Sequence, residues 1–283
     1  MATFFNQATL TYNNNVINSN ITTGELQEVL TITKTPVQNT YTPADEVTYL
    51  INIRNTGTLP YNGLTITDNL GEYATGTLTL VPLTYADGSV NYFVNGIPQA
   101  TPAVTARYPL TITGIDVPAG GTATVVYTAQ INSFAPLDIG STIINTATAT
   151  GSGITPISAE ATITAAEEAN LTISKALCPT VVTENGQITY TFVIQNTGNT
   201  PVVATDNAII TDTFNPILSD IAVTFNAAAW TAPGNYTYNT ATGQFATNPG
   251  QITVPAATYT QDPATGIYVI QPGVSVLTVT GTV

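Results

Sequence analysis

The sequence contains no histidine, a single cysteine and few charges: charged residues make up 7% of the chain, and only four are cationic. With a formal net charge of −13 and no basic patch, nothing can neutralise a row of phosphates, which excludes nucleic acid as a partner. The same lack argues against an anionic membrane surface. No apolar run approaches transmembrane length, so we predict no membrane insertion.

Common catalytic and metal-binding patterns are also missing. The sequence has no nucleophile elbow, phosphate-binding loop, zinc motif or calcium loop, so we predict no turnover enzyme, no cofactor and no metal. The lone Cys178 excludes an intrachain disulfide. We expect it to be a small, semi-buried residue; an intermolecular disulfide is the alternative.

Lysine is nearly absent as well, and its two copies occupy equivalent places. Lys34 lies in LTITKT (30–35) and Lys175 in LTISKA (171–176). In both strands Leu, Ile and Lys share one side while Thr or Ser faces the other. This pattern puts the ammonium on the apolar face, where an isolated charge is costly. A buried lysine must be paired, neutralised or reacted, and we interpret both as crosslinking residues.

What the chain does contain is a repeat of short alternating segments. VTYLINIRNTG (47–57) matches ITYTFVIQNTG (188–198), and each copy predicts a strand with one buried face that ends in a turn requiring glycine. LTITD (64–68) matches IITD (209–212), and GTATVVY (121–127) matches GVSVLTV (273–279). We therefore predict an all-β fold of two tandem immunoglobulin-like β-sandwiches.

The two copies differ at their ends. The first continues into IINTATAT (143–150), whereas the second stops before any such segment and so lacks its last strand. A similar segment, FFNQATLT (4–11), lies near the N-terminus. Its residues Phe4, Asn6, Ala8 and Leu10 alternate as Ile143, Asn145, Ala147 and Ala149 do. We predict that it is a donor strand for the incomplete sandwich.

This pattern predicts the domain organisation and the assembly. We expect a donor strand and connector (1–27), a first sandwich (28–152), a linker (153–169) and an incomplete second sandwich (170–283). Donation to the next subunit by β-strand addition is a heterologous contact that makes a head-to-tail homopolymer. Closure within one subunit is the alternative, but short connections rarely reach so far. An unknown anchor or tip protein stays open as a further partner.

The ordered motifs Leu-Thr-Ile-Thr-Lys, Thr-Tyr, Asn-Thr-Gly, Thr-Asp and Asn-Thr-Ala-Thr resemble those of the bacterial surface-repeat family of unknown function often called DUF-eleven. Such repeats are similar to the stalk modules of Gram-positive adhesins and pilins. The resemblance implies an immunoglobulin-like fold and a spontaneous Lys–Asn isopeptide bond assisted by a buried Asp or Glu.

The residues present permit that chemistry. Burial can lower the pKa of a lysine enough to give a free amine, and a nearby carboxyl group can shuttle protons to the departing ammonia. By position we assign Lys34, Asp68 and Asn145 to the first sandwich. The second set is Lys175, Asp212 and the Asn6 of a neighbouring subunit, which would make each junction covalent.

Several alternatives stay open. In one alternative, the lysines form unreacted ion pairs with Asp68 and Asp212. In another, each lysine forms its bond directly with the Asp carboxyl group, and Asn only assists the reaction. Asp206 is a second candidate acid. The alternative function is that of a monomeric adhesin or a carbohydrate- or protein-binding module, in which Trp230 and the insertion 225–268 contact the ligand. The simpler role for Trp230 and the tyrosines of this insertion is ordinary packing within the sandwich.

The N-terminal residues also bear on localisation. Residues 1–6 have neither a basic region nor a long apolar core, unlike a secretory signal. We therefore expect an extracellular filament of the cell or spore surface that is assembled inside a mother cell, like an endospore appendage. A secreted pilus or surface-layer protein is the alternative.

Overall fold

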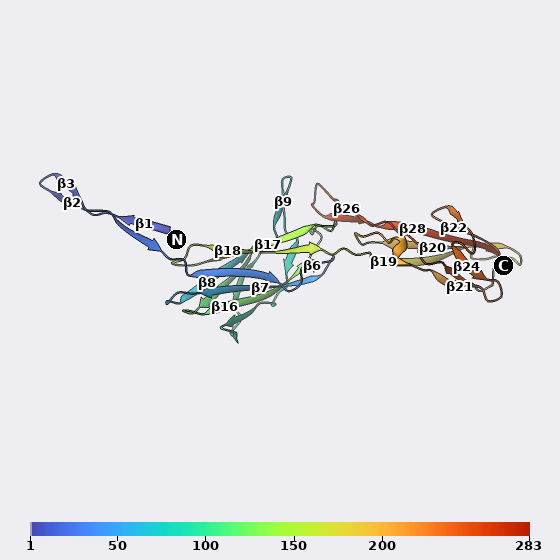
Figure 1. The fold of residues 1–283 in the computed structure, drawn as a ribbon, viewed down its shortest axis with the longest axis horizontal. Coiled ribbons are helices and arrows are strands. Elements are labelled where there is room, and N and C mark those ends of the chain that lie inside the picture. Colours follow the sequence, from blue (N-terminus) through green and yellow to red (C-terminus); the bar gives the residue numbers. More distant parts are fainter. Residues whose placement is uncertain (1) are drawn as a thin grey trace.

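The structure, a computed structural model, describes residues 2–283 and is all-β, as predicted. Met1, in the predicted donor segment, lies outside the described residues. Figure 1 shows three parts in a row: a projecting N-terminal hairpin, a larger sandwich and a smaller one. One turn of 3-10 helix, η1 (Ala204–Asp206), interrupts the strands.

The first sandwich consists of two sheets. The first sheet has the order β13-β12-β16-β7-β5, with β11 also paired to β16. Its strands are β5 (Leu30–Pro36), β7 (Glu46–Asn55), β11 (Leu83–Tyr85), β12 (Asn91–Val94), β13 (Ile97–Pro98) and β16 (Thr122–Ile131). The second has the order β14-β15-β8-β17-β18-β6. Its strands are β6 (Thr40–Tyr41), β8 (Tyr61–Asp68), β14 (Ala103–Arg107), β15 (Leu110–Val117), β17 (Thr142–Thr150) and β18 (Ile157–Ala165). A separate hairpin joins β9 (Tyr73–Thr75) to β10 (Leu78–Leu80).

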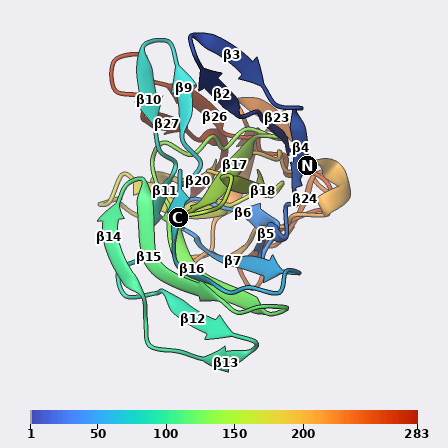
Figure 2. The ribbon, with the colours of Figure 1, turned by 90° about the vertical axis from the view of Figure 1, so that its left-hand side faces the viewer.

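A period of two in burial along the strands marks this core. In β7, Val47, Tyr49, Ile51 and Ile53 are buried, while the residues between them are only half-buried or exposed. The same period of two runs through β16 and β17, as expected for strands that pack one face of each sheet against the other. Seen end-on, the strands of the first sheet curve below those of the second (Figure 2).

The prediction that residues 153–169 form a linker is wrong, because residues 157–165 form strand β18. Residues 157–165 pair with β17 in an unbroken antiparallel register and with β6 in parallel. Ala161, Ile163 and Ala165 face the core and are buried, while Glu160 faces outward. The segment alternates with period two and belongs to the first sandwich, so that this sandwich continues for two strands after β16.

The second sandwich repeats this plan with fewer strands. Its first sheet has the order β19-β20-β28-β22-β23, and its second has the order β21-β25-β24. The strands are β19 (Leu171–Cys178), β20 (Gln187–Asn196), β21 (Thr211–Thr213), β22 (Ser219–Phe225), β23 (Ala228–Trp230), β24 (Tyr236–Asn239), β25 (Gln244–Thr247) and β28 (Gly273–Thr282). The order β24-β25-β21 corresponds to β14-β15-β8 of the first sandwich.

The second sandwich has an open side. In the first sandwich, β17 pairs with the free edge of β8 and is followed by β18, but among residues 2–283 no strand pairs with the matching edge of β21. Every residue of β19 is exposed, whereas Leu30 and Lys34 of its counterpart β5 are buried. The described part of the second sandwich therefore has no counterpart of β17, the last-strand position that the sequence predicts to be absent, and none of β18 either.

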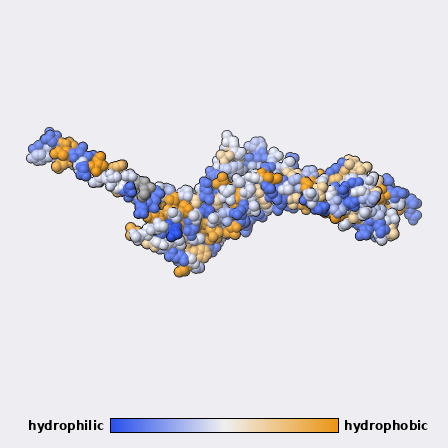
Figure 3. Space-filling model, viewed as in Figure 1, coloured by the Kyte–Doolittle hydropathy of each residue, from blue (hydrophilic) through white to orange (hydrophobic). Residues whose placement is uncertain are grey.

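The N-terminal segment is a two-stranded hairpin rather than a single extended strand. Strand β1 (Ala2–Asn6) pairs with β4 (Thr22–Leu26), and β2 (Thr9–Tyr12) pairs with β3 (Asn15–Asn18). Asn13 and Asn14 form the tip with positive φ angles of 46° and 62°, a conformation that asparagine tolerates in a tight turn. The large apolar side chains of this arm are exposed: Phe4, Phe5, Leu10, Tyr12, Val16, Ile17 and Ile21. They form orange patches along the arm in Figure 3.

The two sandwiches meet through a polar and partly apolar junction. Asn199 donates hydrogen bonds to the carbonyls of Leu137 (3.0 Å) and Ala166 (2.8 Å). The hairpin of β26 (Thr258–Gln261) and β27 (Tyr268–Gln271) lies beside the β9–β10 hairpin (Figures 1 and 2). There the Gln261 side-chain amide donates to the Tyr73 hydroxyl (3.0 Å).

Candidate crosslink sites

The first site lies between the two sheets of the first sandwich. Lys34 comes from β5 in one sheet, while Asp68 ends β8 and Asn145 lies in β17 of the other. Asp68 pairs with Ala147, so Asn145, two residues before Ala147 on the same face of β17, is brought beside the end of β8. The structure thus brings together all three residues predicted for this site.

Lys34 and Asp68 form a buried ion pair. The Lys34 Nζ lies 2.7 Å from the Asp68 Oδ2, and both side chains are 0% exposed. The same carboxylate oxygen accepts a hydrogen bond from the Tyr127 hydroxyl (2.7 Å), and the Leu70 amide donates to Oδ1 (3.0 Å). Three donors converge on one carboxylate, which satisfies a charge that would otherwise be costly to bury.

Tyr127 connects this pair to Asn145. The Asn145 Nδ2 donates to the Tyr127 hydroxyl (2.9 Å), and the Gly71 amide donates to the Asn145 Oδ1 (3.2 Å). The hydroxyl therefore bridges the asparagine and the aspartate. Comparison of the two repeats did not indicate Tyr127, because its counterpart in the second repeat, Val279, has no polar group. The signal that the sequence offered was a tyrosine at a position of the strand that faces the core.

Aromatic rings surround the ammonium group. The Lys34 Nζ lies 4.9 Å from the ring centre of Tyr49 and 5.9 Å from that of Tyr127. The two rings are stacked with their centres 5.5 Å apart. Burial raises the pKa of both tyrosines, which keeps their hydroxyls protonated. The Tyr49 hydroxyl is buried and has no hydrogen-bond partner among the described residues.

Burial also makes Lys34 a better nucleophile than an exposed lysine. Removal from water lowers its pKa from 10.5 to about 8, although the neighbouring Asp68 carboxylate opposes this change. The fraction of free amine near neutral pH is then far larger than for an exposed lysine. The Gly71 amide, already bonded to the Asn145 carbonyl oxygen, is placed to stabilise negative charge on that oxygen during an attack at its carbon.

The second site is only half assembled within one chain. Lys175 forms an ion pair with Asp212, and its Nζ lies 4.4 Å from the ring centre of Tyr190 and 5.5 Å from those of Phe192 and Phe214. The expectation that Lys175 is buried is wrong for the single chain: its side chain is 40% exposed, because no strand covers β19. Asn6 lies in the projecting arm at the other end of the molecule (Figure 1).

The repeated Asn-Thr-Gly segments have a different role from the predicted one. The buried Asn55 donates to the carbonyls of Leu59 (2.7 Å) and Pro118 (3.1 Å), and the buried Asn196 does the same to Thr200 (2.8 Å) and Pro255 (3.1 Å). The glycine that follows is not required by its φ angle. A Cβ on Gly198 would lie 2.1 Å from the Glu168 carbonyl oxygen, so this position needs glycine for close backbone approach.

The remaining candidates have ordinary surroundings. Trp230 is half-buried and stacks on Phe225 with ring centres 4.8 Å apart, and Tyr236 is buried in the core. Asp206 accepts a hydrogen bond from the Val203 amide (2.8 Å) at the start of η1. Cys178 is exposed, so the expectation of a semi-buried thiol is wrong for the single chain.

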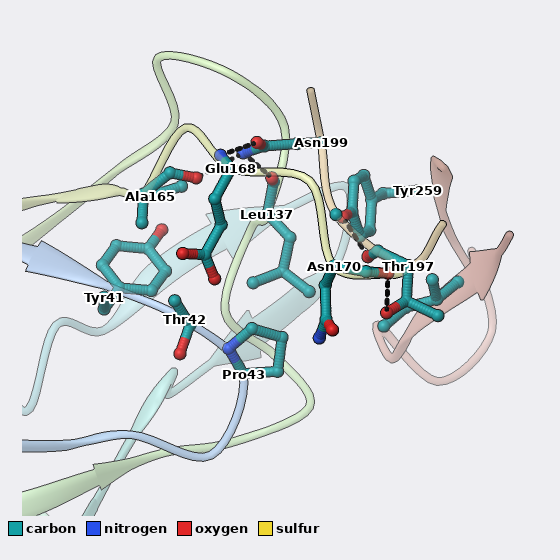
Figure 4. A pocket seen from close by; sticks show the side chains of 13 residues that line it. Tyr41, Thr42, Pro43, Leu137, Ala165, Glu168, Asn170, Thr197, Asn199 and Tyr259 are labelled. Atoms are coloured by element: carbon teal, nitrogen blue, oxygen red, sulfur yellow. Dashed lines mark hydrogen bonds between the residues drawn. The ribbon is translucent and has the colours of Figure 1, made fainter. Parts of the chain in front are cut away.

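A pocket lies at the junction of the two sandwiches. It is lined by Tyr41, Leu137, Glu168, Asn199, Tyr259 and neighbouring residues (Figure 4). Within residues 2–283, no cluster of three or more His, Cys, Asp or Glu side chains converges on a metal site. The described chain also has no helix of the length and apolarity needed to cross a membrane.

Comparison with known proteins gives remote structural similarity only. No family model matches the chain, and no curated protein matches it, so the resemblance to the DUF-eleven repeats stays a prediction. The chain is similar to BcpA, the major pilin subunit of Bacillus cereus, at 13% identity and a TM-score of 0.35, over 95% of this chain and 73% of that one.

Two further solved structures show similarity at the same level. The pilus backbone RrgB from Streptococcus pneumoniae matches at 13% identity and a TM-score of 0.32, over 86% of this chain and 55% of that one. The collagen-binding domain of a Staphylococcus aureus adhesin matches at 15% identity and a TM-score of 0.31, over 50% of this chain and 99% of that domain.

Proposed function

We propose that the chain is a structural subunit of an extracellular bacterial filament, assembled head-to-tail by donor-strand complementation. The observation that carries the proposal is the open edge of β21, at the place where β17 completes the first sandwich. The N-terminal segment repeats the alternation of β17 and leaves its apolar side chains exposed. An open strand edge and a matching strand that is paired along only one of its own edges are the two halves of a β-addition contact.

The register of the first sandwich specifies the contact. Asp68 pairs with Ala147 and Thr67 with Thr148, so Asp212 of one subunit pairs with Ala8 of the next, and Thr211 with Thr9. Phe4, Asn6, Ala8 and Leu10 then face the core of the neighbouring sandwich. Burying Phe4 and Leu10 contributes about 1.5–3 kcal/mol for each side chain.

Isopeptide bonds lock the proposed polymer. In the first sandwich a proton passes from the Lys34 ammonium to the Asp68 carboxylate, which is 2.7 Å away, and the free amine attacks the Asn145 side-chain carbonyl carbon. The new C–N bond forms as the C–NH2 bond breaks: Asp68 gives its proton to the departing group, which leaves as ammonia, and takes up the second proton of the attacking nitrogen, so that Asp68 ends as a neutral carboxylic acid. Lys175, Asp212 and the neighbour's Asn6 perform the same reaction at each junction.

Direct Lys–Asp bonding is the competing chemistry at the first site. Lys34 contacts Asp68, whereas Asn145 is linked to Asp68 through Tyr127. A Lys–Asp amide would release water in place of ammonia, and an unreacted ion pair would release neither. The mass of the intact chain therefore separates the three alternatives.

Polymerisation itself is tested with the full chain and a chain that lacks residues 1–12. We expect the full chain to form filaments visible by electron microscopy and to elute as very large species in size-exclusion chromatography, while the shortened chain stays monomeric. A full chain that remains monomeric at high concentration would contradict the proposal and favour a monomeric adhesin or binding module. Filaments of the shortened chain would exclude donation of the first strand.

The proposed location is the cell or spore surface, and the main partner of the chain is a second copy of itself. The reaction uses only side chains of the chain and needs no cofactor. A chain with few charged residues and many Thr and Asn residues suits a chemically inert filament. An anchor or tip protein would complete such a polymer.

A further inference from the structure

The β1–β4 half of the N-terminal hairpin has the same internal register as β17 and β18. Asn145 pairs with Ala161 and Asn6 pairs with Thr22, and the partners are 16 residues apart in both pairs. Ile143 pairs with Ile163 and Phe4 with Gly24, again at one common separation of 20 residues. A single shift of the numbering therefore superimposes β1 and β4 on β17 and β18. Nearer the tip, the β2–β3 pairs are offset from that register by one residue, since Thr9 pairs with Asn18 whereas Thr148 pairs with Ser158.

In the first sandwich, β18 has a function that β17 does not perform. It lies against β5, the strand that carries Lys34, and extends the sheet to β6 through the parallel pairs Thr164–Thr40 and Ala165–Tyr41. Leu30 and Lys34 of β5 are buried beneath this cover. One added strand would therefore complete the edge of β8 without closing the side of the sandwich that contains the lysine.

In the second sandwich, both the edge of β21, which corresponds to β8, and the face of β19, which corresponds to β5, are uncovered among the described residues. On β19, Leu171 is 42% exposed, Ile173 57% and Leu177 37%, and each occupies the face that β5 buries. Val181 and Val182 correspond to Thr40 and Tyr41, since the starts of β5 and β7 are as far apart in sequence as the starts of β19 and β20. Val181 is 87% exposed and has no strand partner among the described residues. The unfilled space thus corresponds to a hairpin.

We propose that each subunit donates the whole hairpin 2–26 to the next copy, with residues 18–26, which include β4, taking the place of β18 over β19. The inference rests on the proposed function, because the occupant is a second copy of this chain. By the register of the first sandwich, β4 then lies parallel to the loop before β20, with Glu25 opposite Val181 and Leu26 opposite Val182. Lys175 becomes covered as Lys34 is.

The inner layer of the hairpin supports this placement by its packing. Where the first sandwich stacks Ile143 against Ile163, the arm has Phe4 against Gly24. The Phe4 ring lies across the glycine, and a Cβ there would be 2.3 Å from its Cζ. One aromatic ring thus covers both positions that two aliphatic side chains fill in the first sandwich.

The connections after both hairpins also match. The Thr56 amide donates to the Val29 carbonyl (2.8 Å) just after β4, and the Thr197 amide donates to the Asn170 carbonyl (2.9 Å) just after β18. Donation of the complete hairpin therefore sets the first sandwich of one subunit against the second sandwich of its neighbour. That junction has the same order of elements as the junction within a chain.

Two engineered disulfides test the hairpin separately from the first strand. In a background with both Cys178→Ser and Asn6→Ala, in which no isopeptide joins the subunits, Thr9→Cys with Thr211→Cys reports donation of β2, whereas Glu25→Cys with Val181→Cys reports donation of β4. Directly paired strand residues fall within the Cα separation of about 4.4–6.8 Å that a disulfide needs. Glu25→Cys with Val274→Cys, which places the second thiol on an exposed position of β28, is the mismatched control.

We expect both matched pairs, and not the control, to give disulfide-linked ladders in non-reducing gels under mild oxidation. If only the Thr9–Thr211 pair links subunits, a single strand is donated and the hairpin proposal is overturned while the filament proposal stands. If neither pair links subunits, both proposals fail. The ladder must disappear after reduction in the Asn6→Ala background, where no isopeptide joins the subunits.

A packing swap gives a second test that needs no thiol. Gly24→Ile should block assembly, because its side chain meets the Phe4 ring, whereas Phe4→Ile with Gly24→Ile should restore it by recreating the Ile143–Ile163 pair. Donation of the first strand alone separates Phe4 from Gly24. Unimpaired assembly of the Gly24→Ile variant, or no rescue in the double variant, would overturn the hairpin proposal.

Discussion

Tyr127 and Val279 occupy the same position in the two sandwiches: Tyr127 pairs with Tyr49 across β16 and β7, and Val279 pairs with Tyr190 across β28 and β20. Only the first sandwich therefore has a hydroxyl between its aspartate and its asparagine position. In the first site this hydroxyl holds Asn145 before any reaction. At the proposed junction Asn6 must be positioned by strand pairing alone.

Tyr127→Phe should lower the thermal stability of the first sandwich. The change removes one hydrogen bond to Asp68 and one from Asn145 in a fully buried site, and we expect a loss of about 1–3 kcal/mol in the free energy of unfolding. Differential scanning calorimetry measures it. Tyr85→Phe is the matched control, because that ring tilts against Tyr127 at 6.5 Å but lies outside the hydrogen-bonded site. Equal losses in both variants would contradict the bridging role.

The intact mass of the chain should reveal the first crosslink. In chains that lack residues 1–12, which stay monomeric, we expect the otherwise wild-type chain to be lighter than its sequence mass by one ammonia, and both Lys34→Met and Asn145→Ala to have the full mass. Loss of one water that persists in Asn145→Ala would identify Asp68 as the acceptor. A full-mass wild type would leave Lys34 and Asp68 as an unreacted ion pair.

The pH dependence of stability should reveal the buried lysine when it cannot react. In Asn145→Ala, Lys34 is protonated in both states below pH 8, but between pH 8 and 10.5 only the unfolded state keeps the proton. The unfolded state then binds more protons, so stability rises with pH across this window. At about 1.4 kcal/mol per pKa unit, a pKa lowered from 10.5 to about 8 gives about 3 kcal/mol.

The control for this measurement is Lys34→Met combined with Asn145→Ala, which removes the titrating group and leaves the rest of the chain unchanged. We expect the difference in unfolding free energy between the two variants to increase from pH 8 to pH 10.5. A difference that stays constant, or falls, over this range would show that Lys34 is not held in the low-dielectric site.

Gly198→Ala should disturb the junction of the two sandwiches. The added carbon would lie 2.1 Å from the Glu168 carbonyl oxygen and 2.6 Å from the Asn170 amide nitrogen, so the connection between β18 and β19 must move. We expect faster proteolysis at this connection and a lower melting temperature. Gly76→Ala is the control with open space around its Cβ, although its positive φ adds a small local cost. Similar proteolysis of the two variants would contradict the close-approach argument.

Much of the fold followed from the alternation of residues. Residues 47–55 and 188–196 have a clear period of two and form β7 and β20. The spacing between Lys34, Asp68 and Asn145 placed them correctly on facing strands, because repeats align equivalent positions even where each motif is weak. Whether these residues react is a separate matter, and the crosslinks stay predictions.

Other features depended on contacts that the sequence does not show. Strand β18 was predicted to be a linker because its alanines and Glu160 lack the large residues that mark a buried strand; its burial follows from pairing with β17. The glycines of the Asn-Thr-Gly segments were assigned to turns, whereas the backbone segment that passes over Gly198 comes from 166–170. Such close approaches are set by tertiary packing and leave only a glycine as a signal.

Asn6→Ala should separate assembly from covalent locking. The variant keeps Phe4, Ala8 and Leu10 for strand addition but lacks the amide that Lys175 would attack, so we expect filaments of normal appearance that dissolve into monomers on boiling in detergent. Asn145→Ala is the matched control: it removes the corresponding amide within the first sandwich and should leave the filaments resistant to boiling. Tryptic peptides of wild-type filaments should contain Lys175 joined to the Asn6 peptide with one ammonia lost. If Asn6→Ala filaments resist boiling as well as wild type does, the covalent junction lies elsewhere, and the assignment of Lys175 and Asn6 is wrong.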